Sequence, residues 1–312
     1  MKTLYFKYAV EVERIGSITQ AADNLYMAQP NLSKAIKELE DSLGISIFKR
    51  TSKGVLPTVK GAEFLKYAKN ILAQMDKIEA LNISDESRKQ NINISIPHGS
   101  YIAKGLTSFV AELDQEKEIA INIKETNSME AISNIIYDKF DLGIIRYQCI
   151  YENYFLNYLA EKDFCYDLIW EYEYLALMSK NHPLASSKDV PYAELSKFME
   201  ITHGDISIPY ITGSDTKKIK DPSPLKKRIY VYERCSQFDL LSHIPATFMW
   251  VSPIPQDLLD RYDLIQRKCF VPNHQCKDVL IYPKGYKFTP LDKKLIDKLY
   301  EAKNEVAFRE YF

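Results

Sequence analysis

Residues 28–44 read AQPNLSKAIKELEDSLG and predict a helix with one apolar and one polar side. The apolar positions recur at steps of four, three and four, which places them on a single stripe of an α-helix. They are Leu32, Ile36, Leu39 and Leu43. Gly44 is expected to end this helix, and Pro30 fits its first turn. The other side can reach base edges and phosphates if the helix lies in the major groove of DNA. The candidate contact residues are Gln29, Pro30, Asn31, Ser33, Lys34 and Lys37.

A shorter helix is expected just before this one. Ser17 and Gln20 have the spacing of a capping box, in which Ser17 accepts from the backbone near Gln20 and the Gln20 side chain reaches back. Ala21 and Ala22 are small enough for two helices to cross closely. Two short helices, a tight turn and a polar face on the second helix together predict a helix-turn-helix.

A small β-hairpin is predicted after Gly44, with strands at residues 45–50 and 55–58 and a turn between them. Arg50 and Lys53 near its tip are candidate DNA contacts, because a cationic wing can follow the backbone or enter the minor groove. Residues 46–69 hold six Lys or Arg against one acid, which attracts phosphates. The alternative is a three-helix bundle with a hairpin whose charged face is merely solvated.

A long helix is predicted from the N-cap Thr58 to about Asp85. Its apolar residues alternate by four and three, as in a heptad seam. They are Phe64, Ala68, Ile71, Met75 and Ile78. At 1.5 Å per residue the helix would span roughly 40 Å, which a small domain alone cannot bury. We therefore expect a homodimer through this helix; the alternative is an amphipathic helix packed on its own chain.

Strands and helices alternate from Asn91 onward. Their order over residues 92–145 predicts a mostly parallel sheet, and a second α/β unit is expected over residues 174–251. A strand at 278–282 would return the chain to the first unit. The predicted fold class is α/β, with an N-terminal winged helix-turn-helix, a long linker helix and a two-lobed α/β domain. The predicted domains are 1–58 for DNA binding, 59–88 for linker and dimerisation, 89–171 with 274–312 for lobe I, and 172–273 for lobe II.

Ligands of open α/β sheets bind outside the carboxyl ends of the strands, so polar residues there are candidates. They are His98, Ser100, Thr126, Asn127, Ser128, Arg146, Thr202, His203 and Ser252. Ser100 and Ser128 precede helices, so their amides and hydroxyls could hold an anion beside the fixed charge of Arg146. Ordinary helix capping explains either serine equally well, and a salt bridge would place Arg146 equally well.

The composition is that of an ordinary globular protein, with 46% hydrophobic and 27% charged residues in a chain of 312. No stretch approaches the roughly 18 apolar residues of a membrane span, and the start shows no signal-peptide pattern. We therefore expect a cytoplasmic protein with no membrane partner. The five cysteines are odd in number and scattered, which suits reduced thiols. Residues 1–90 hold fourteen Lys and Arg against eleven Asp and Glu, so the remainder carries the net negative charge.

These features resemble the LysR-type transcriptional regulators. The matching stretches follow the family's order: residues 8–12, 16–17, 19–22, 28–34, 36, 39–40, 43–44, 48–50, 174–178 and 182–185. The resemblance implies a regulator whose binding to operator DNA is modulated by a small-molecule effector between two lobes similar to periplasmic solute-binding proteins. It implies operator contacts by Gln29, Ser33 and Lys34, a DNA-contacting wing, and an effector contact by Ser100. It also implies a homodimer or homotetramer, and RNA polymerase as a partner.

One residue departs from the family pattern. Ala28 stands where the family usually has a serine that can cap the recognition helix. Loss of such a cap costs on the order of 1 kcal/mol. Asn31 or a phosphate contact is a candidate for compensating this loss.

An enzyme and a redox sensor are the rival classes. The sequence holds no GxGxxG, P-loop, HExxH or GxSxG motif, and its five histidines show no metal-ligand spacing, so we predict no enzyme, cofactor or metal site. Cys269 and Cys276 are close in sequence, as in the peroxide-sensing pair of some family members. By family position, however, they fall in a different part of the chain.

Overall fold

The structure is a computed structural model. It describes residues 3–51, 54–80, 89–205, 227–232, 235–272 and 274–308. Contacts divide the chain into one compact unit of Met1–Ile92, Ser108–Ile121 and Lys287–Asn304, and another of Asn93–Thr107, Asn122–Tyr286 and Glu305–Phe312. Within the described ranges, no helix has the length and apolar character needed to cross a bilayer. The domain boundaries expected from the sequence stay a prediction.

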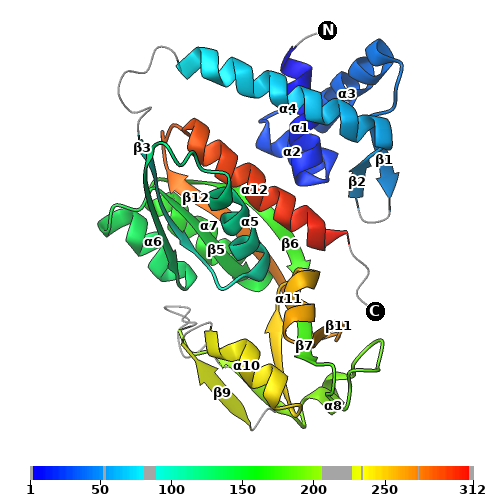
Figure 1. Ribbon diagram of the computed structural model, residues 1–312, viewed down its shortest axis with the longest axis vertical. Helices are drawn as coiled ribbons and strands as arrows, with labels where there is room; N and C mark the ends of the chain where they lie inside the picture. Colours follow the sequence, from blue (N-terminus) through cyan, green and yellow to red (C-terminus); the bar gives the residue numbers. More distant parts are fainter. Residues whose placement is uncertain are drawn as a thin grey trace. The chain divides into compact units, whose positions relative to one another are not determined.

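The amino-terminal module consists of helices and a two-stranded hairpin (Figure 1). Its elements are α1 (Thr3–Ile15), α2 (Ile18–Asn24), α3 (Gln29–Leu43), β1 (Phe48–Thr51), β2 (Gly54–Pro57) and α4 (Val59–Ala80). The winged helix-turn-helix is confirmed, and α1 is an element that we did not predict. Phe6 and Val12 of α1 are buried, and the Phe6 ring packs edge-on against Phe64 of α4 with centroids 5.5 Å apart.

The helix ends described in this module agree with the sequence except at Gln20. Ser17 accepts from the Gln20 N–H, but the Gln20 side chain donates to Asn24 Oδ1 rather than reaching back, so the capping box is only half formed. Thr58 Oγ1 accepts from the Gly61 N–H at 2.9 Å, as expected of an N-cap. Helix α4 is described to Ala80, and its expected continuation to Asp85 lies outside the described residues.

A five-stranded sheet has the order β4-β3-β5-β12-β6. Its strands are β3 (Lys89–Ile96), β4 (Glu118–Glu125), β5 (Leu142–Gln148), β6 (Phe164–Glu173) and β12 (Gln275–Pro283). Strand β3 is parallel to β5, but β12 is antiparallel to both β5 and β6, so the sheet is mixed rather than mostly parallel. The reason is that β12 enters from the second sheet, against the direction of the crossover strands. Helices α5 (Ser100–Ala111), α6 (Ser128–Tyr137) and α7 (Glu152–Glu161) lie between these strands in sequence, and α12 (Pro290–Ala307) follows β12. Helix α7 and strand β6 were not predicted.

The second sheet has the order β11-β7-β10-β8-β9. Its strands are β7 (Leu175–Ser179), β8 (Met199–His203), β9 (Arg228–Val231), β10 (Thr247–Val251) and β11 (Leu264–Arg267), with helices α8 (Tyr192–Leu195), α10 (Cys235–His243) and α11 (Gln256–Arg261). Strand β8 is parallel to β9 and β10. Alternate residues of β7 enter different cores: Leu177 packs with Leu241 of α10, whereas Ala176 and Met178 pack with Leu195 of α8. The α/β fold class with two sheets is therefore confirmed.

Candidate DNA-binding face and ligand site

Helix α3 is held by its apolar stripe. Leu32 and Leu39 are fully buried and Ile36 nearly so, while Leu43 at the end of the helix is half-buried. Gly44 follows in the left-handed conformation with φ of 66°, and its N–H bonds to the Glu40 carbonyl. Such a position favours glycine and ends the helix as predicted. The stripe therefore orients the opposite side of α3 toward solvent.

The start of α3 has no side-chain cap. The N-cap residue is Ala28, and only its carbonyl takes part, accepting from the backbone N–H groups of Asn31 and Leu32. The first N–H groups of the helix thus remain available to an oxygen from outside, such as a phosphate. The expected compensation by the Asn31 side chain is not among the hydrogen bonds of the described residues.

The predicted DNA contacts on α3 lie at the surface. Pro30, Asn31, Lys34 and Lys37 are exposed, and Gln29 and Ser33 are half-buried. Among the described residues, neither Lys34 nor Lys37 takes part in an ion pair. Both ammonium groups can therefore meet phosphates without first breaking an internal contact. Whether these residues touch DNA stays a prediction.

The turn before α3 contains an exposed aromatic residue, Tyr26. Tyr26 has φ of 51°, a left-handed backbone conformation that residues other than glycine and asparagine rarely adopt. Its side chain is 86% exposed, so no packing in the described structure offsets this conformation. The tight turn of the helix-turn-helix is thus made at a local energetic cost.

The hairpin is joined closely to α4. Thr58 donates its hydroxyl to the Ser46 carbonyl and its N–H to the Ile47 carbonyl. A Cβ atom on Gly61 would overlap the backbone of Ile47, so only glycine fits at this crossing. Arg50 on β1 is exposed, whereas Lys53 lies outside the described residues.

Arg146, a predicted effector residue, is engaged by the protein itself. Its guanidinium donates to both carboxylate oxygens of Asp278 at 2.7 Å and to the His98 carbonyl at 2.8 Å. Asp278 is fully buried and also accepts from the hydroxyls of Tyr101 and Tyr172. Burial alone would lower the pKa of Arg146, but the Asp278 carboxylate raises it above its ordinary value. The salt-bridge alternative therefore accounts for Arg146 in this structure.

The two residues that start α6 also have internal roles. Asn127 caps the helix by accepting from the Glu130 N–H at 2.9 Å. The Ser128 hydroxyl donates to the Arg146 carbonyl and accepts from the Arg146 N–H. Helix capping and strand attachment thus occupy these side chains, as the alternative reading of the sequence allowed.

The remaining predicted effector residues differ in accessibility. Ser100, Thr126 and Ser252 are buried, and Thr202 and His203 at the end of β8 are half-buried. Ser252 offers its carbonyl to the Gln266 amide at 3.4 Å. The fold brings His203 beside another predicted residue, His98.

His98 and His203 form the centre of a polar cluster at the ends of β3 and β8. Their rings stack with centroids 4.0 Å apart and planes 11° apart. His98 Nε2 lies 3.2 Å from Asp205 Oδ2, and His98 Nδ1 lies 3.8 Å from Glu125 Oε2. Burial lowers the pKa of His98, but its contacts with the two carboxylates raise that pKa above the ordinary value. Burial and the neighbouring His98 lower the pKa of His203 to about 4.

Sequence reasoning did not predict the acidic members of these two groups. Asp205 follows β8 within two residues of His203, so the rule of strand ends could have included it. Asp278 interrupts the apolar run of β12, and a charge in a buried strand signals a partner opposite it. Glu125 is the last residue of β4 and was taken only as part of a strand.

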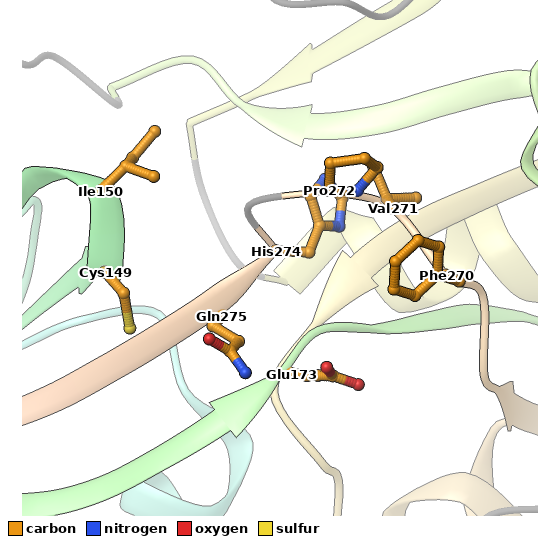
Figure 2. Close-up of a pocket in the computed structure, with 8 residues that line it drawn as sticks. All are labelled: Cys149, Ile150, Glu173, Phe270, Val271, Pro272, His274 and Gln275. Carbon is orange, nitrogen blue, oxygen red and sulfur yellow. The ribbon is translucent and has the colours of Figure 1, made fainter.

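A separate pocket of 380 Å³ contains none of the predicted effector residues. Figure 2 shows Cys149 and Ile150 on one side of it and the segment of Phe270, Val271 and Pro272 on the other. Its other lining residues are Glu173, His274 and Gln275. Phe270 is 85% exposed, so the pocket is open on that side.

The cysteines near this pocket do not have the properties of a redox pair. Burial raises the pKa of Cys269 to about 11 and that of Cys276 to about 12. A thiol reacts with peroxide as the thiolate, so such values disfavour reaction near neutral pH. The redox-sensor reading therefore has no support from these two side chains.

Comparison with known proteins addresses the family. Residues 5–62 match the profile described as "Bacterial regulatory helix-turn-helix protein, lysR family". A probable RuBisCO transcriptional regulator of Thalassiosira pseudonana is 30% identical over 176 residues, 55% of this chain and 54% of that protein. The transcriptional activator AllS of Salmonella typhimurium is 25% identical over 271 residues, 84% of this chain and 82% of that protein.

The chain spans only 54% to 62% of the length of several of the curated relatives that it matches. Among solved structures, full-length BenM is 19% identical, with a TM-score of 0.49 and coverage of 99% of both chains. The matched relatives are transcription regulators by name, and the profile coincides with the helix-turn-helix described above. The amino-terminal module, residues 5–62, is a bacterial regulatory helix-turn-helix of the lysR family.

Proposed function

We propose that this chain regulates transcription by binding operator DNA through α3 and the β1–β2 wing. The observation that carries the proposal is the polar side of α3. Its cations, Lys34 and Lys37, are exposed and have no ion-pair partner among the described residues, and the buried stripe of Leu32 and Leu39 fixes their direction. A helix of this kind can enter a major groove without rearranging its own core.

The proposed active form is a homodimer joined through α4, with a homotetramer as the higher assembly. Tyr67 and Ile71 of α4 are 58% and 42% exposed, an apolar surface that the described part of the chain leaves uncovered. Leu65 and Ala68 on the same helix are buried within the chain, so α4 presents apolar residues in two directions. The sequence alternative of a helix packed only on its own chain accounts for Leu65 and Ala68 but not for Tyr67.

The two-sheet region is proposed to be the effector-binding domain, with lobes at residues 89–171 plus 274–312 and at 172–273. The candidate site is at the ends of β3 and β8, where His98 and His203 meet. An effector there would alter operator binding or its geometry by favouring one conformation over another. A cytoplasmic location, contact with RNA polymerase and the absence of enzymatic activity complete the proposal.

DNA binding is tested with the purified full-length chain and labelled genomic fragments in the presence of bulk competitor DNA. We expect preference for particular fragments and an affinity that falls steeply with salt. Arg50→Ala should reduce the slope of log affinity against log salt by about 0.9 if one phosphate contact is lost. Lys117→Ala, which removes an exposed lysine far from this module in sequence, serves as the matched control.

Absence of any fragment preference would overturn the regulator proposal. An Arg50→Ala slope equal to that of the native chain would overturn only the role of the wing. Effector binding is tested separately, by a thermal-shift screen of small metabolites on the full-length chain, because a ligand that binds the folded state raises its melting temperature.

A further inference from the structure

The cluster around His98 contains ligand atoms that the protein does not use. His203 Nδ1, Asp205 Oδ1 and His98 Nδ1 are fully buried and have no hydrogen-bond partner in the described structure. Buried polar atoms are satisfied in the great majority of cases, and each unsatisfied one has a cost of about 1–3 kcal/mol. Three such atoms within one cluster indicate that a group outside the described residues satisfies them.

The spacing of these residues is close to that of a metal site. One ligand atom from each of His98, His203 and Asp205 lies within 4.8 Å of the other two. Bonds of about 2.1 Å in tetrahedral geometry put neighbouring ligand atoms about 3.4 Å apart. The pair His98 Nε2 and Asp205 Oδ2, at 3.2 Å, already has that separation. Rotation of the His203 ring out of its stack on His98 would bring the third ligand in.

The donor set selects a class of ion. Two imidazoles and a carboxylate suit Zn²⁺ and the neighbouring divalent transition metals, whereas Mg²⁺ and Ca²⁺ favour oxygen ligands throughout. Glu125, 3.8 Å from the other nitrogen of His98, is placed to hold that ring by an outer-shell contact or to complete the ligands. The surrounding carboxylates also give the cluster the negative charge that a divalent ion requires.

We propose that His98, His203 and Asp205 bind a divalent transition metal ion of the zinc class. The inference rests on the proposed function, since it assigns a ligand class to the same candidate effector site. The ion would join the end of β3 to the end of β8, which belong to different sheets. It would also unstack the two imidazole rings, because parallel rings cannot both aim a nitrogen lone pair at one ion.

The glycines that follow the two histidines are closely approached by neighbouring side chains. A Cβ atom on Gly204 would come within 2.5 Å of the Tyr232 ring, and one on Gly99 within 2.9 Å of the Arg146 guanidinium. The residue after each histidine is therefore tightly covered. A side chain at either position would therefore displace Arg146 or Tyr232.

The competing explanation is a protein-only ion pair, in which protonated His98 lies between Asp205 and Glu125. It explains the contacts of His98, but it leaves His203 Nδ1 without a partner. The two explanations differ in one measurable respect, because only a metal site binds an added ion in a ratio of one per chain.

The test uses the full-length chain without a polyhistidine tag, treated with a chelator and dialysed. Zn²⁺ is titrated calorimetrically, and Co²⁺ is titrated with visible absorption as the readout, since its d–d bands report nitrogen and oxygen ligation. We expect one ion per chain for the native protein. His203→Gln and Asp205→Asn should each weaken Zn²⁺ binding by at least about 100-fold, more than typical second-shell changes do.

His243→Gln is the matched control, because His243 is an exposed histidine at the end of α10, outside the cluster. It should bind Zn²⁺ as the native chain does. Melting curves recorded in chelator must agree for all variants, which separates loss of ligands from loss of fold. Two variants at different ligands ensure that one misfolded protein does not decide the outcome.

Absence of one-to-one ion binding by the native chain would overturn the proposal, as would native affinity in both His203→Gln and Asp205→Asn. Fragment binding by the metal-free chain is measured in parallel. A chain that binds DNA fragments but no ion refutes the metal site alone. A chain that binds the ion but shows no fragment preference refutes the regulator proposal alone.

Discussion

On the polar side of α3, Lys34 and Lys37 are exposed and have no ion-pair partner among the described residues, whereas Arg146 is held by Asp278 and His98 by Asp205. Exposed charges cost little to keep, and they contribute to binding mainly when counterions are released. Buried charges are stabilised by their partners and are costly to leave alone. The first region therefore has the properties expected of the proposed DNA-binding face, and the second those expected of the proposed ligand site.

The largest effect is expected where a buried pair is broken. Asp278→Asn keeps the shape of the side chain but leaves the Arg146 guanidinium without its counter-charge, so the free energy of unfolding should fall by about 3–5 kcal/mol. Denaturant unfolding measures this loss. Asp257→Asn, at an exposed aspartate that contacts Lys104, should cost no more than about 1 kcal/mol. Equal losses in the two variants would contradict the contrast between buried and exposed charges.

His182 is a buried histidine outside both regions, and burial is the cause of its pKa shift. It therefore tests the effect of burial without that of an ion pair. His182 is 3% exposed, and burial lowers its pKa from 6.5 to about 4. Between these values the unfolded chain takes up a proton that the folded chain does not, so stability falls as pH drops from 6.5 toward 4. The loss attributable to His182 should reach about 3 kcal/mol at the lower end.

The measurement is the stability of the native chain and of His182→Asn as a function of pH. Asparagine keeps an acceptor where His182 Nδ1 now accepts from the Leu184 N–H at 3.0 Å. The difference between the two curves should grow in favour of the variant as the pH falls. Parallel curves would show that His182 does not titrate as its burial implies.

Removal of a charge from α3 should weaken DNA binding but leave the free energy of unfolding almost unchanged, unlike the loss of stability expected for Asp278→Asn. Lys34→Ala is expected to change the free energy of unfolding by less than about 0.5 kcal/mol, since the side chain is exposed. Its affinity for a preferred DNA fragment should fall about tenfold, equivalent to about 1.4 kcal/mol. Anisotropy titrations and denaturant curves on the same preparations give both numbers. A stability loss as large as the affinity loss would mean that Lys34 is structural.

The smallest effect is expected at the turn between α2 and α3. Tyr26→Gly removes the penalty of a left-handed tyrosine, at a site where the exposed ring contributes little packing, and should stabilise the chain by about 0.5–1 kcal/mol. Leu25→Gly, next to it but with an ordinary φ of −88°, should destabilise. A loss of stability in Tyr26→Gly would indicate that the ring has a packing role.

The sequence predicts most of the amino-terminal module because its signals are local. The stripe of Leu32 and Leu39, the left-handed Gly44 and the N-cap Thr58 each act within a few residues, and each lies where the pattern placed it. The prediction for the Gln20 side chain is wrong for an equally local reason, since that side chain donates to Asn24 one turn later.

The ligand region is less predictable because its contacts are distant in sequence. His98 and His203 are 105 positions apart, and their stacking depends on which strand ends the topology brings together. The antiparallel direction of β12, and with it the pairing of Asp278 with Arg146, depends on where the chain re-enters the first sheet. Residue periodicity carries no information on either point, so the sequence could not show that Arg146 pairs with Asp278.

The joint at Thr58 has a mechanical consequence. Because Thr58 bonds to two carbonyls of the segment leading into β1, and Gly61 touches the Ile47 backbone, the hairpin and the start of α4 turn as one piece. Twisting of α4 about its long axis is then transmitted to Arg50 instead of being absorbed in a loop. In two copies paired along α4, the angle between the hairpins would be set by the helix pair, so the spacing of recognisable half-sites would be a property of the protein and not of the duplex.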